Sequence, residues 1–268
     1  MFEPEPVERR SIVEYPPEGG SVRSVERALD LLVALERAGG PLGVSELGRL
    51  TGMPKATAQR LLTVLERRGF LQKEEGRYQL GAGLVPLARA FLTGNSLTRS
   101  ALPVLEELAL LSGETACLYV RQGFDRIVVQ RVESNHPMRY TIRVGQRLPL
   151  HVGAAGRVLA AAMPVEELRQ LLDQVGPIRL ASGRIVSREE FLAGLEEIRG
   201  RGIAISREER DTGVVSVAAP VVRRGRGTIA AVAVVGPPSR MTQEKVECLS
   251  VEIRGAAQRM AEGYHLHW

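Results

Sequence analysis

Residues 42–80 read LGVSELGRLTGMPKATAQRLLTVLERRGFLQKEEGRYQL, and this stretch decides the fold of the N-terminal part of the chain. Ser45 is placed to cap a first helix, and Thr51-Gly52 then breaks that helix as a tight turn between two helices requires. Pro54 opens a second helix. Its apolar residues follow the i, i+3, i+4, i+7 spacing of a buried stripe, and they are Ala58, Leu61, Leu62 and Leu65.

A hairpin follows the second helix. Gly69 ends the helix as its C′ residue, and a strand that starts at Phe70 returns through the turn Glu74-Glu75-Gly76. A helix pair alone also occurs in ordinary helical proteins, but here a further amphipathic helix precedes the pair. Together the helices and the hairpin predict a winged helix-turn-helix, which reads DNA. The expected buried stripe of the preceding helix is Val25, Ala28, Leu29, Leu32 and Leu35.

The polar face of the second helix suits an anionic duplex, because it carries no carboxylate before Glu66. Between Lys55 and Arg77 the chain has six Lys or Arg against three Glu, which is a modest local excess of positive charge. Side chains of this kind reach phosphates and base edges in a major groove. The candidate DNA-binding residues are Ser45, Lys55, Thr57, Gln59, Arg60 and Thr63 from the helices, and Lys73, Arg77 and Tyr78 from the hairpin.

Length and composition fit one small and one medium domain. The 268 residues are 44% hydrophobic, which is enough for a real core, and the net charge of +5 is compatible with a polyanionic partner. Two cysteines form no disulfide framework, and no apolar run reaches the length of about 18 residues that a membrane helix needs. Residues 1–20 are rich in Glu and Pro, resemble no signal peptide, and predict a disordered tail. The composition therefore predicts a cytoplasmic protein without a membrane partner.

Helices and β-hairpins alternate along the rest of the chain, which predicts an α+β domain with a mostly antiparallel sheet. The predicted strands are 115–121, 126–132, 216–222 and 228–235. The predicted helices are 81–95, 101–112, 153–163, 164–174, 187–201 and 242–262. The helix at 81–95 links the two domains, and its apolar stripe packs either on its own chain or on a second subunit.

Catalysis is not expected, because the chain contains no G-x-S-x-G, G-x-x-x-x-G-K or H-E-x-x-H motif. We therefore expect no enzyme activity, no cofactor and no metal. The alternative to DNA binding is a ligand-binding module that acts through protein partners. An interface of that kind favours exposed aromatic residues, whereas only 4% of this chain is aromatic.

From about Val22 to Ala261, the chain resembles the IclR family of bacterial transcriptional regulators. Besides the winged helix, the resemblance is carried by SVERALDLLVAL (24–35), LPLHVGAAGRVLAA (148–161), RGIAISREERDTGVVSVAAPV (201–221) and VVGPPSR (234–240). It implies a winged helix-turn-helix domain at 21–81, a linker helix at 82–96, and a GAF/PAS-like effector-binding domain at 97–268. It also implies a homodimer or dimer of dimers on a double-stranded operator, with repression as the commoner role.

The resemblance further places a small organic-acid effector beside the GAAG segment. Ala155 and Gly156 would offer backbone N–H groups to its carboxylate at a helix N-terminus; the alternative is that Gly153 and Gly156 only permit a tight strand-to-helix turn. Ala233 and Val235 stand where relatives that bind very small oxo acids have serines, so an effector with an aromatic or aliphatic body is expected. The remaining candidates are Cys117, His151, Ser206, Asp211 and Ser216; Cys117 and Tyr119 either line the cavity or fill the core, and His151 either tunes ligand charge or is structural.

Overall fold

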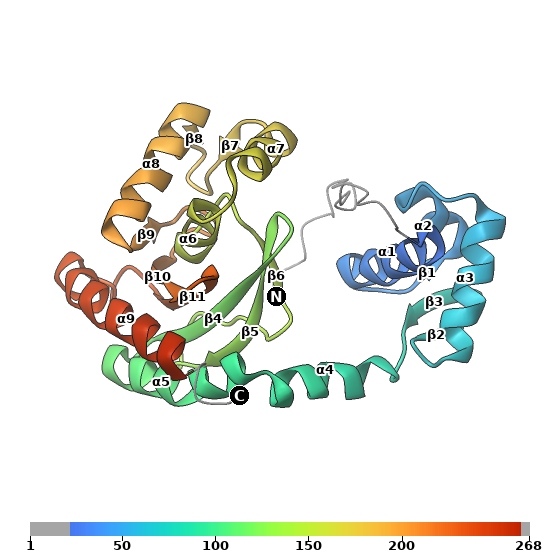
Figure 1. The fold of residues 1–268 in the computed structure, drawn as a ribbon, viewed down its shortest axis with the longest axis horizontal. Helices are drawn as coiled ribbons and strands as arrows, with labels where there is room; N and C mark the ends of the chain where they lie inside the picture. The colour runs from blue at the N-terminus through green and yellow to red at the C-terminus, as the bar shows by residue number, and fades with distance from the viewer. Residues whose placement is uncertain (1–21, 264–268) are drawn as a thin grey trace. The chain divides into compact units, whose positions relative to one another are not determined.

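The computed structural model describes residues 22–263 (Figure 1). They form two compact units, one that ends at Phe91 and one that begins at Leu92. The predicted tail at 1–20 lies outside the described residues. Among the described residues, none of the helices combines the length and the apolar character needed to cross a membrane.

The N-terminal unit packs three helices against a small antiparallel sheet whose strand order is β1-β3-β2. Its elements are α1 (Arg23–Ala38), β1 (Leu42–Gly43), α2 (Val44–Leu50), α3 (Lys55–Arg67), β2 (Leu71–Glu74) and β3 (Arg77–Leu80). The predicted order of helices and hairpin is confirmed. The strand β1 carries no pattern that would have predicted it, because it has only two residues and is held by pairing with β3.

Glycines end α3 and form the hairpin turn as predicted. Gly69 has a φ of +75° and its N–H donates to the carbonyl oxygen of Glu66 at 2.8 Å. At the turn between β2 and β3, both Glu75 (φ 48°) and Gly76 (φ 79°) adopt the left-handed conformation. Positive φ at both central residues matches the twist of the flanking strands, so the turn closes the hairpin tightly.

Two local predictions in this unit are wrong. Ser45 does not cap α2, because the helix already begins at Val44 and its N-terminal N–H, that of Gly43, donates to the Glu46 carboxylate at 2.7 Å. In α1 the buried residues are Leu31, Ala34 and Leu35, whereas Val25 and Leu29 are each 55% exposed. The apolar residues of α1 occupy more than one face of the helix, so its sequence is compatible with two overlapping buried stripes. Packing against the rest of the N-terminal unit buries only one of them.

The C-terminal unit is a layered α+β domain. Its strands are β4 (Thr115–Gln122), β5 (Asp125–Val132), β6 (Arg147–Pro149), β7 (Ile178–Arg179), β8 (Ile185–Val186), β9 (Ala204–Arg207), β10 (Val215–Arg223) and β11 (Gly227–Gly236). Its helices are α5 (Ser96–Ser112), α6 (Ala154–Ala161), α7 (Val165–Val175), α8 (Arg188–Arg201) and α9 (Gln243–Gly263). The helix α4 (Leu84–Gly94) contains the point where the chain divides into its two units.

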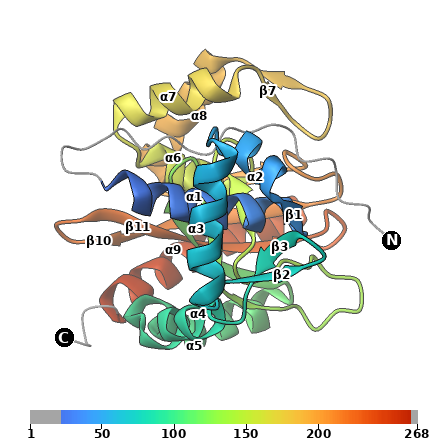
Figure 2. The same cartoon turned by 90° about the vertical axis from the view of Figure 1, so that its right-hand side faces the viewer.

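Six strands form one antiparallel sheet in the order β6-β5-β4-β11-β10-β9. Helices α5 and α9 cover one face, and α6 covers the other with α7 and α8 beyond it (Figure 2). Side chains of a strand alternate between faces, so Ala230, Val232 and Val234 face α5 and α9. Ala231, Ala233 and Val235 point to the opposite face, toward α6. That face holds the effector candidates.

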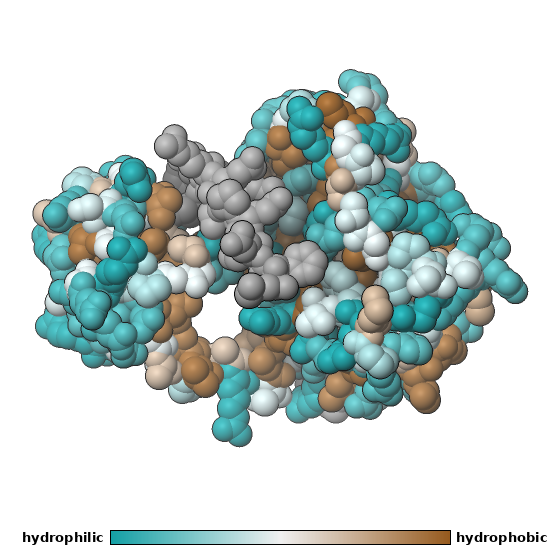
Figure 3. All heavy atoms as spheres, turned by 180° about the vertical axis from the view of Figure 1, so that it is seen from behind, coloured by the Kyte–Doolittle hydropathy of each residue, from teal (hydrophilic) through white to brown (hydrophobic). Residues whose placement is uncertain are grey.

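The helix α4 buries none of its residues within the described chain. Val85, Leu87 and Phe91 are large apolar side chains that it leaves exposed. Figure 3 shows hydrophobic side chains on the surface of this connecting segment. Whether this apolar stripe packs on its own chain or on a second subunit stays a prediction.

Candidate functional site

The exposed face of α3 is basic. Lys55, Arg60 and Arg67 are exposed along it, and Arg49 and Ser45 are exposed on the preceding helix α2. Ala58, Leu62 and Leu65 point the other way, into the core of the unit. Because the apolar stripe is fully used in packing, the outer face of α3 is left for solvent or for a charged partner.

Gln59 and Thr63 are half-buried and bonded inside the unit. The Gln59 side-chain amide donates to the Tyr78 hydroxyl at 3.0 Å and to the Thr63 hydroxyl at 3.4 Å. The Thr63 hydroxyl donates to the backbone oxygen of Gln59 at 2.9 Å. These bonds orient the flank of α3 beside the exposed cations, and Thr57 is likewise half-buried.

The hairpin corrects one candidate. Tyr78 is 0% exposed and belongs to the core of the unit, so it cannot reach a nucleic acid from this position. Lys73 remains exposed, with its ammonium 5.4 Å from the centre of the Tyr78 ring. Arg77 is half-exposed, but it donates to the backbone oxygen of Pro41 at 2.8 Å and pairs with Glu46 at 3.1 Å. Its guanidinium therefore ties the hairpin to α2.

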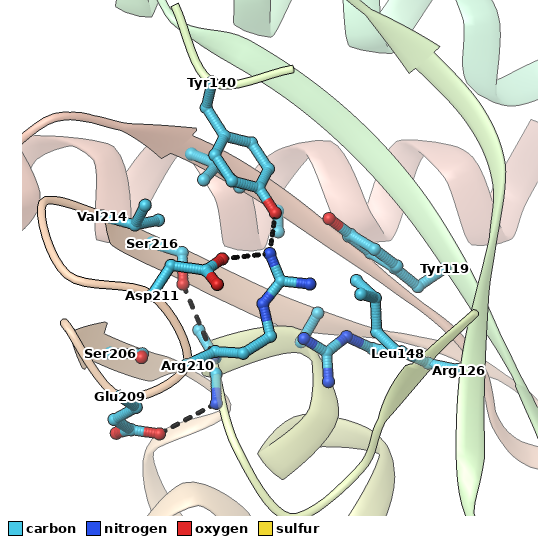
Figure 4. A pocket seen from close by; sticks show the side chains of 15 residues that line it. Tyr119, Arg126, Tyr140, Leu148, Ser206, Glu209, Arg210, Asp211, Val214 and Ser216 are labelled. Carbon is cyan, nitrogen blue, oxygen red and sulfur yellow. Dashed lines mark hydrogen bonds and ion pairs between the residues drawn. The ribbon is translucent and has the colours of Figure 1, made fainter. Parts of the chain in front are cut away.

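The C-terminal unit contains a pocket between the sheet, the turn before α6 and the segment 206–216 (Figure 4). Six of the predicted residues line it together: Ala155, Ser206, Asp211, Ser216, Ala233 and Val235. Four polar residues of the lining were not predicted from the sequence, and they are Arg126, Tyr140, Glu209 and Arg210. Arg157, which lies beside the pocket and pairs with Glu209, was not predicted either. Of these five residues, only Arg157, Glu209 and Arg210 could have been found from the sequence, because they lie in the stretches 148–161 and 201–221 that resemble the family.

Three predicted residues do not line the pocket: Cys117, His151 and Gly156, the last of which packs against Leu150 and Arg126 in the first turn of α6. Cys117 is fully buried in the core on the pocket side of the sheet, and burial raises the pKa of its thiol to about 12, so it stays a neutral, apolar filler. His151 precedes α6 but is not part of the lining. The candidates that remain come from α6, β9, β10, β11 and the loop between β9 and β10.

The N-terminus of α6 opens into this pocket. The Gly153 N–H donates to a Glu209 carboxylate oxygen at 2.9 Å, and the Ala154 N–H donates to the Ser216 hydroxyl at 3.4 Å. The N–H groups of Ala155 and Gly156 have no acceptor within residues 22–263. Unpaired N–H groups and the positive end of the helix dipole together favour an anion here.

Gly156 is needed for close packing. A β-carbon at this position would lie 2.5 Å from the backbone oxygen of Leu150 and would overlap the Nη1 atom of Arg126. The side chain of Arg126 thus runs directly under the first turn of α6. The tight turn and the anion site, which the sequence left as alternatives for the glycine segment, are therefore compatible. The close packing at Gly156 forms the turn and also brings the Arg126 guanidinium to the N-terminus of α6.

Gly156→Ala is expected to lower the free energy of unfolding by about 1–3 kcal/mol, because the added methyl group has no space without moving Arg126 or the backbone. Urea unfolding of the full chain measures the change. The matched control is Gly200→Ala on α8, where no atom lies within 4 Å of the new β-carbon. That variant should gain about 0.5–1 kcal/mol of stability, since alanine loses less backbone entropy in a helix. Equal effects at both positions would contradict the packing argument.

Arg210 crosses the pocket. Its guanidinium donates to the Tyr140 hydroxyl, pairs with Asp211, and lies 5.7 Å from the centre of the Tyr140 ring. The pocket has an empty volume of about 410 Å³, which includes its open mouth. Arg210 thus bridges the segment of Tyr140 and the loop between β9 and β10 across this pocket.

Comparisons with known proteins cover nearly all described residues. The family model described as IclR helix-turn-helix domain matches residues 24–75, and the one described as bacterial transcriptional regulator IclR C-terminal matches residues 89–262. The transcriptional repressor IclR of Escherichia coli K12 is 30% identical over 260 residues, which cover 96% of this chain and 95% of that protein.

Solved structures agree with this match. The chain is similar to an IclR transcriptional regulator from Alicyclobacillus acidocaldarius, with a TM-score of 0.78, 26% identity, and coverage of 91% of this chain and 99% of that one. An IclR homologue from Microbacterium hydrocarbonoxydans, complexed with 4-hydroxybenzoate, has a TM-score of 0.71 and 22% identity, and covers 90% of this chain and 98% of its own. At that identity the second likeness shows the fold alone.

Proposed function

This chain belongs to the IclR family of bacterial transcriptional regulators, and from that premise we propose how it reads DNA and what controls it. It is a DNA-binding transcriptional regulator with an effector-binding C-terminal domain. The DNA-binding domain would span 21–81, the linker helix 82–96 and the effector domain 97–268. Its relative in Escherichia coli is a repressor, and we assign the same direction of control to this chain.

Helix α3 would enter the major groove of the operator. The observation that carries this proposal is the exposed basic face of α3, where Lys55 and Arg60 stand free of any carboxylate partner among the described residues. Thr57, Gln59 and Thr63 flank that face and would contact the groove through their polar atoms. Phosphate contacts would come from Ser45 on α2 and from Lys73 and Arg77 on the hairpin.

Arg60→Ala is expected to weaken operator binding by about 1–3 kcal/mol if its guanidinium reads a base. The measurement is fluorescence anisotropy at one fixed salt concentration, on a duplex selected by the wild-type protein from a random pool. Arg179→Ala, which removes an exposed arginine from the C-terminal unit, is the control and should bind as the wild type does. An unchanged affinity for the Arg60 variant would remove this residue from the interface.

The protein would act as a homodimer or a dimer of dimers on a palindromic operator, since two helices α3 related by a two-fold axis read two half-sites. The unburied apolar side chains of α4, Val85, Leu87 and Phe91, support an association between copies of the chain. Such an arrangement lets a small-molecule signal change the population of DNA-competent dimers.

The effector would be a small organic acid held in the pocket beside α6. The unpaired N–H groups of Ala155 and Gly156 favour a carboxylate, and the apolar walls at Ala233 and Val235 favour an aromatic or aliphatic body. An aromatic acid of this class, 4-hydroxybenzoate, is bound by the Microbacterium homologue, which shares the fold. Ser206, Asp211 and Ser216 would contact polar atoms of the acid. Binding coupled to the DNA site is typically worth about 1–3 kcal/mol.

A further inference from the structure

The pocket contains a buried guanidinium without a counter-ion. Arg126 on β5 is 4% exposed, and its Nη1 atom donates to the backbone oxygens of Pro149 and Val152, the latter at 2.9 Å. Its Nε atom is buried and has no hydrogen-bond partner. Nη2 also has no acceptor within residues 22–263. The edge of the guanidinium formed by Nε and Nη2 is thus unused, and Figure 4 shows this side chain in the pocket.

The carboxylates of the pocket are engaged elsewhere. Glu209 accepts from the Arg157 guanidinium at 2.9 Å and from the Gly153 N–H at 2.9 Å. Asp211 pairs with Arg210. Each acidic side chain in the lining is therefore matched by another arginine, and Arg126 supplies the positive charge that remains.

The immediate surroundings of Arg126 are themselves positive. A β-carbon on Gly153 would lie 3.0 Å from Nη2, so the guanidinium rests against the first turn of α6, at the positive end of the helix dipole. Burial is the main cause that lowers the pKa of Arg126 to about 10; Arg210 acts in the same direction, while Tyr119, Tyr140 and Glu209 act in the opposite one. The group still remains protonated at neutral pH.

Such an arrangement is costly unless an anion completes it. A buried charge without a partner destabilises the fold, and an apolar residue of similar length would fill the space without that penalty. The Nε and Nη2 edge of a guanidinium matches the two oxygens of a carboxylate in a bidentate pair. Ala155, whose N–H has no acceptor within residues 22–263, lines the same pocket as Arg126. The geometry and the charge therefore both call for a carboxylate.

We propose that Arg126 is the residue that binds the carboxylate of the effector, through Nε and Nη2, with the N-terminus of α6 on the same group. This inference rests on the proposed role of the pocket as the effector site. The apolar body of the acid then lies along Ala233 and Val235. Arg126 makes the site selective for an ionised acid over a neutral molecule of the same shape.

The test compares Arg126→Met with the wild type, using benzoate and phenylacetate as probes and their amides, benzamide and phenylacetamide, as neutral partners. Calorimetric titration of the full chain measures the four affinities. The wild type is expected to prefer each acid over its amide about 100-fold, equivalent to about 2.8 kcal/mol at 1.4 kcal/mol per tenfold. In Arg126→Met this preference should fall to within about threefold, while amide binding stays unchanged.

Arg121→Met is the matched control. Arg121 lies opposite Arg126 in the register of β4 and β5, but it is exposed and pairs with Glu167 on α7. This variant should keep the full preference for the acid. Arg126→Lys, which keeps the charge and loses the planar fork, should retain part of the preference.

An acid preference that survives in Arg126→Met overturns the inference, and so does a wild type that binds none of the acids. Operator binding of the same preparations separates this outcome from a failure of the proposed function. If the wild type binds the selected duplex but no acid, the role of Arg126 and the organic-acid effector both fall, while the proposed DNA contacts stand. If it binds acids through Arg126 but no duplex, the assignment of Arg126 stands and the proposed DNA contacts fall.

Discussion

Raising the salt concentration from about 50 to 200 mM is expected to weaken operator binding by a factor of about 10³ to 10⁵, if the dimer neutralises about 6–10 phosphates. The cations that would do so are exposed on α2, α3 and the hairpin, and include Arg49, Lys55, Arg60 and Lys73. Each phosphate contact releases condensed counterions, so the logarithm of the binding constant falls linearly with the logarithm of the salt concentration. Anisotropy titrations at four or five salt concentrations give the slope.

The control for this experiment is Lys73→Ala, on the hairpin. Removing one phosphate contact should reduce the slope by about 1 for each half-site while it leaves the sequence preference unchanged. The expected loss of affinity is similar for all duplexes, in contrast to Arg60→Ala, which should relax the preference at one base position. A binding constant that does not depend on salt would contradict the proposed DNA interface as a whole.

Tyr78→Ala is expected to cost about 3–5 kcal/mol of stability, because it removes a fully buried aromatic ring from the small core of the N-terminal unit. It also leaves the Gln59 amide without the hydroxyl that it now contacts at 3.0 Å. A unit of this size has little stability to lose, so the variant should lose operator binding through unfolding of that unit. Circular dichroism during urea unfolding and anisotropy together measure both effects.

The conservative variant separates a packing role from a DNA contact. Tyr78→Phe keeps the ring and removes one hydrogen bond, which is worth about 0.5–1.5 kcal/mol. Its operator affinity should stay close to that of the wild type, since the ring is in the core and not at the surface. A large loss of affinity in a fully folded Tyr78→Phe would restore Tyr78 to the list of DNA contacts.

Local patterns in the sequence were sufficient to predict the long helices and the hairpin of the N-terminal unit. The stripe of Ala58, Leu62 and Leu65, the C′ glycine at Gly69 and the hairpin turn at Glu75-Gly76 each depend on neighbours within about four residues. The short strands β1, β6, β7, β8 and β9 were missed, because two to four residues carry no measurable period. They exist because a longer strand lies alongside them.

Some residues of the pocket could likewise be predicted from the sequence, and others could not. Ala155, Ser206, Asp211, Ser216, Ala233 and Val235 were indicated by a family resemblance, and the structure brings these residues together around one pocket. Arg126 had no such signal, because an arginine in a strand is ordinarily exposed. It is buried here because the carbonyl oxygens of Pro149 and Val152, more than twenty positions away, accept from it.

The sequence by itself thus determined the winged helix, the α+β pattern of the second unit and the family, since these follow from spacing, turn chemistry and ordered motifs. Only the tertiary structure decided that Tyr78 packs inside, that Cys117 fills the core, and that Arg126 lies unpaired beneath the first turn of α6. The physical reason is that the burial and pairing of a single side chain depend on which distant segments surround it. Periodicity carries no information about those segments.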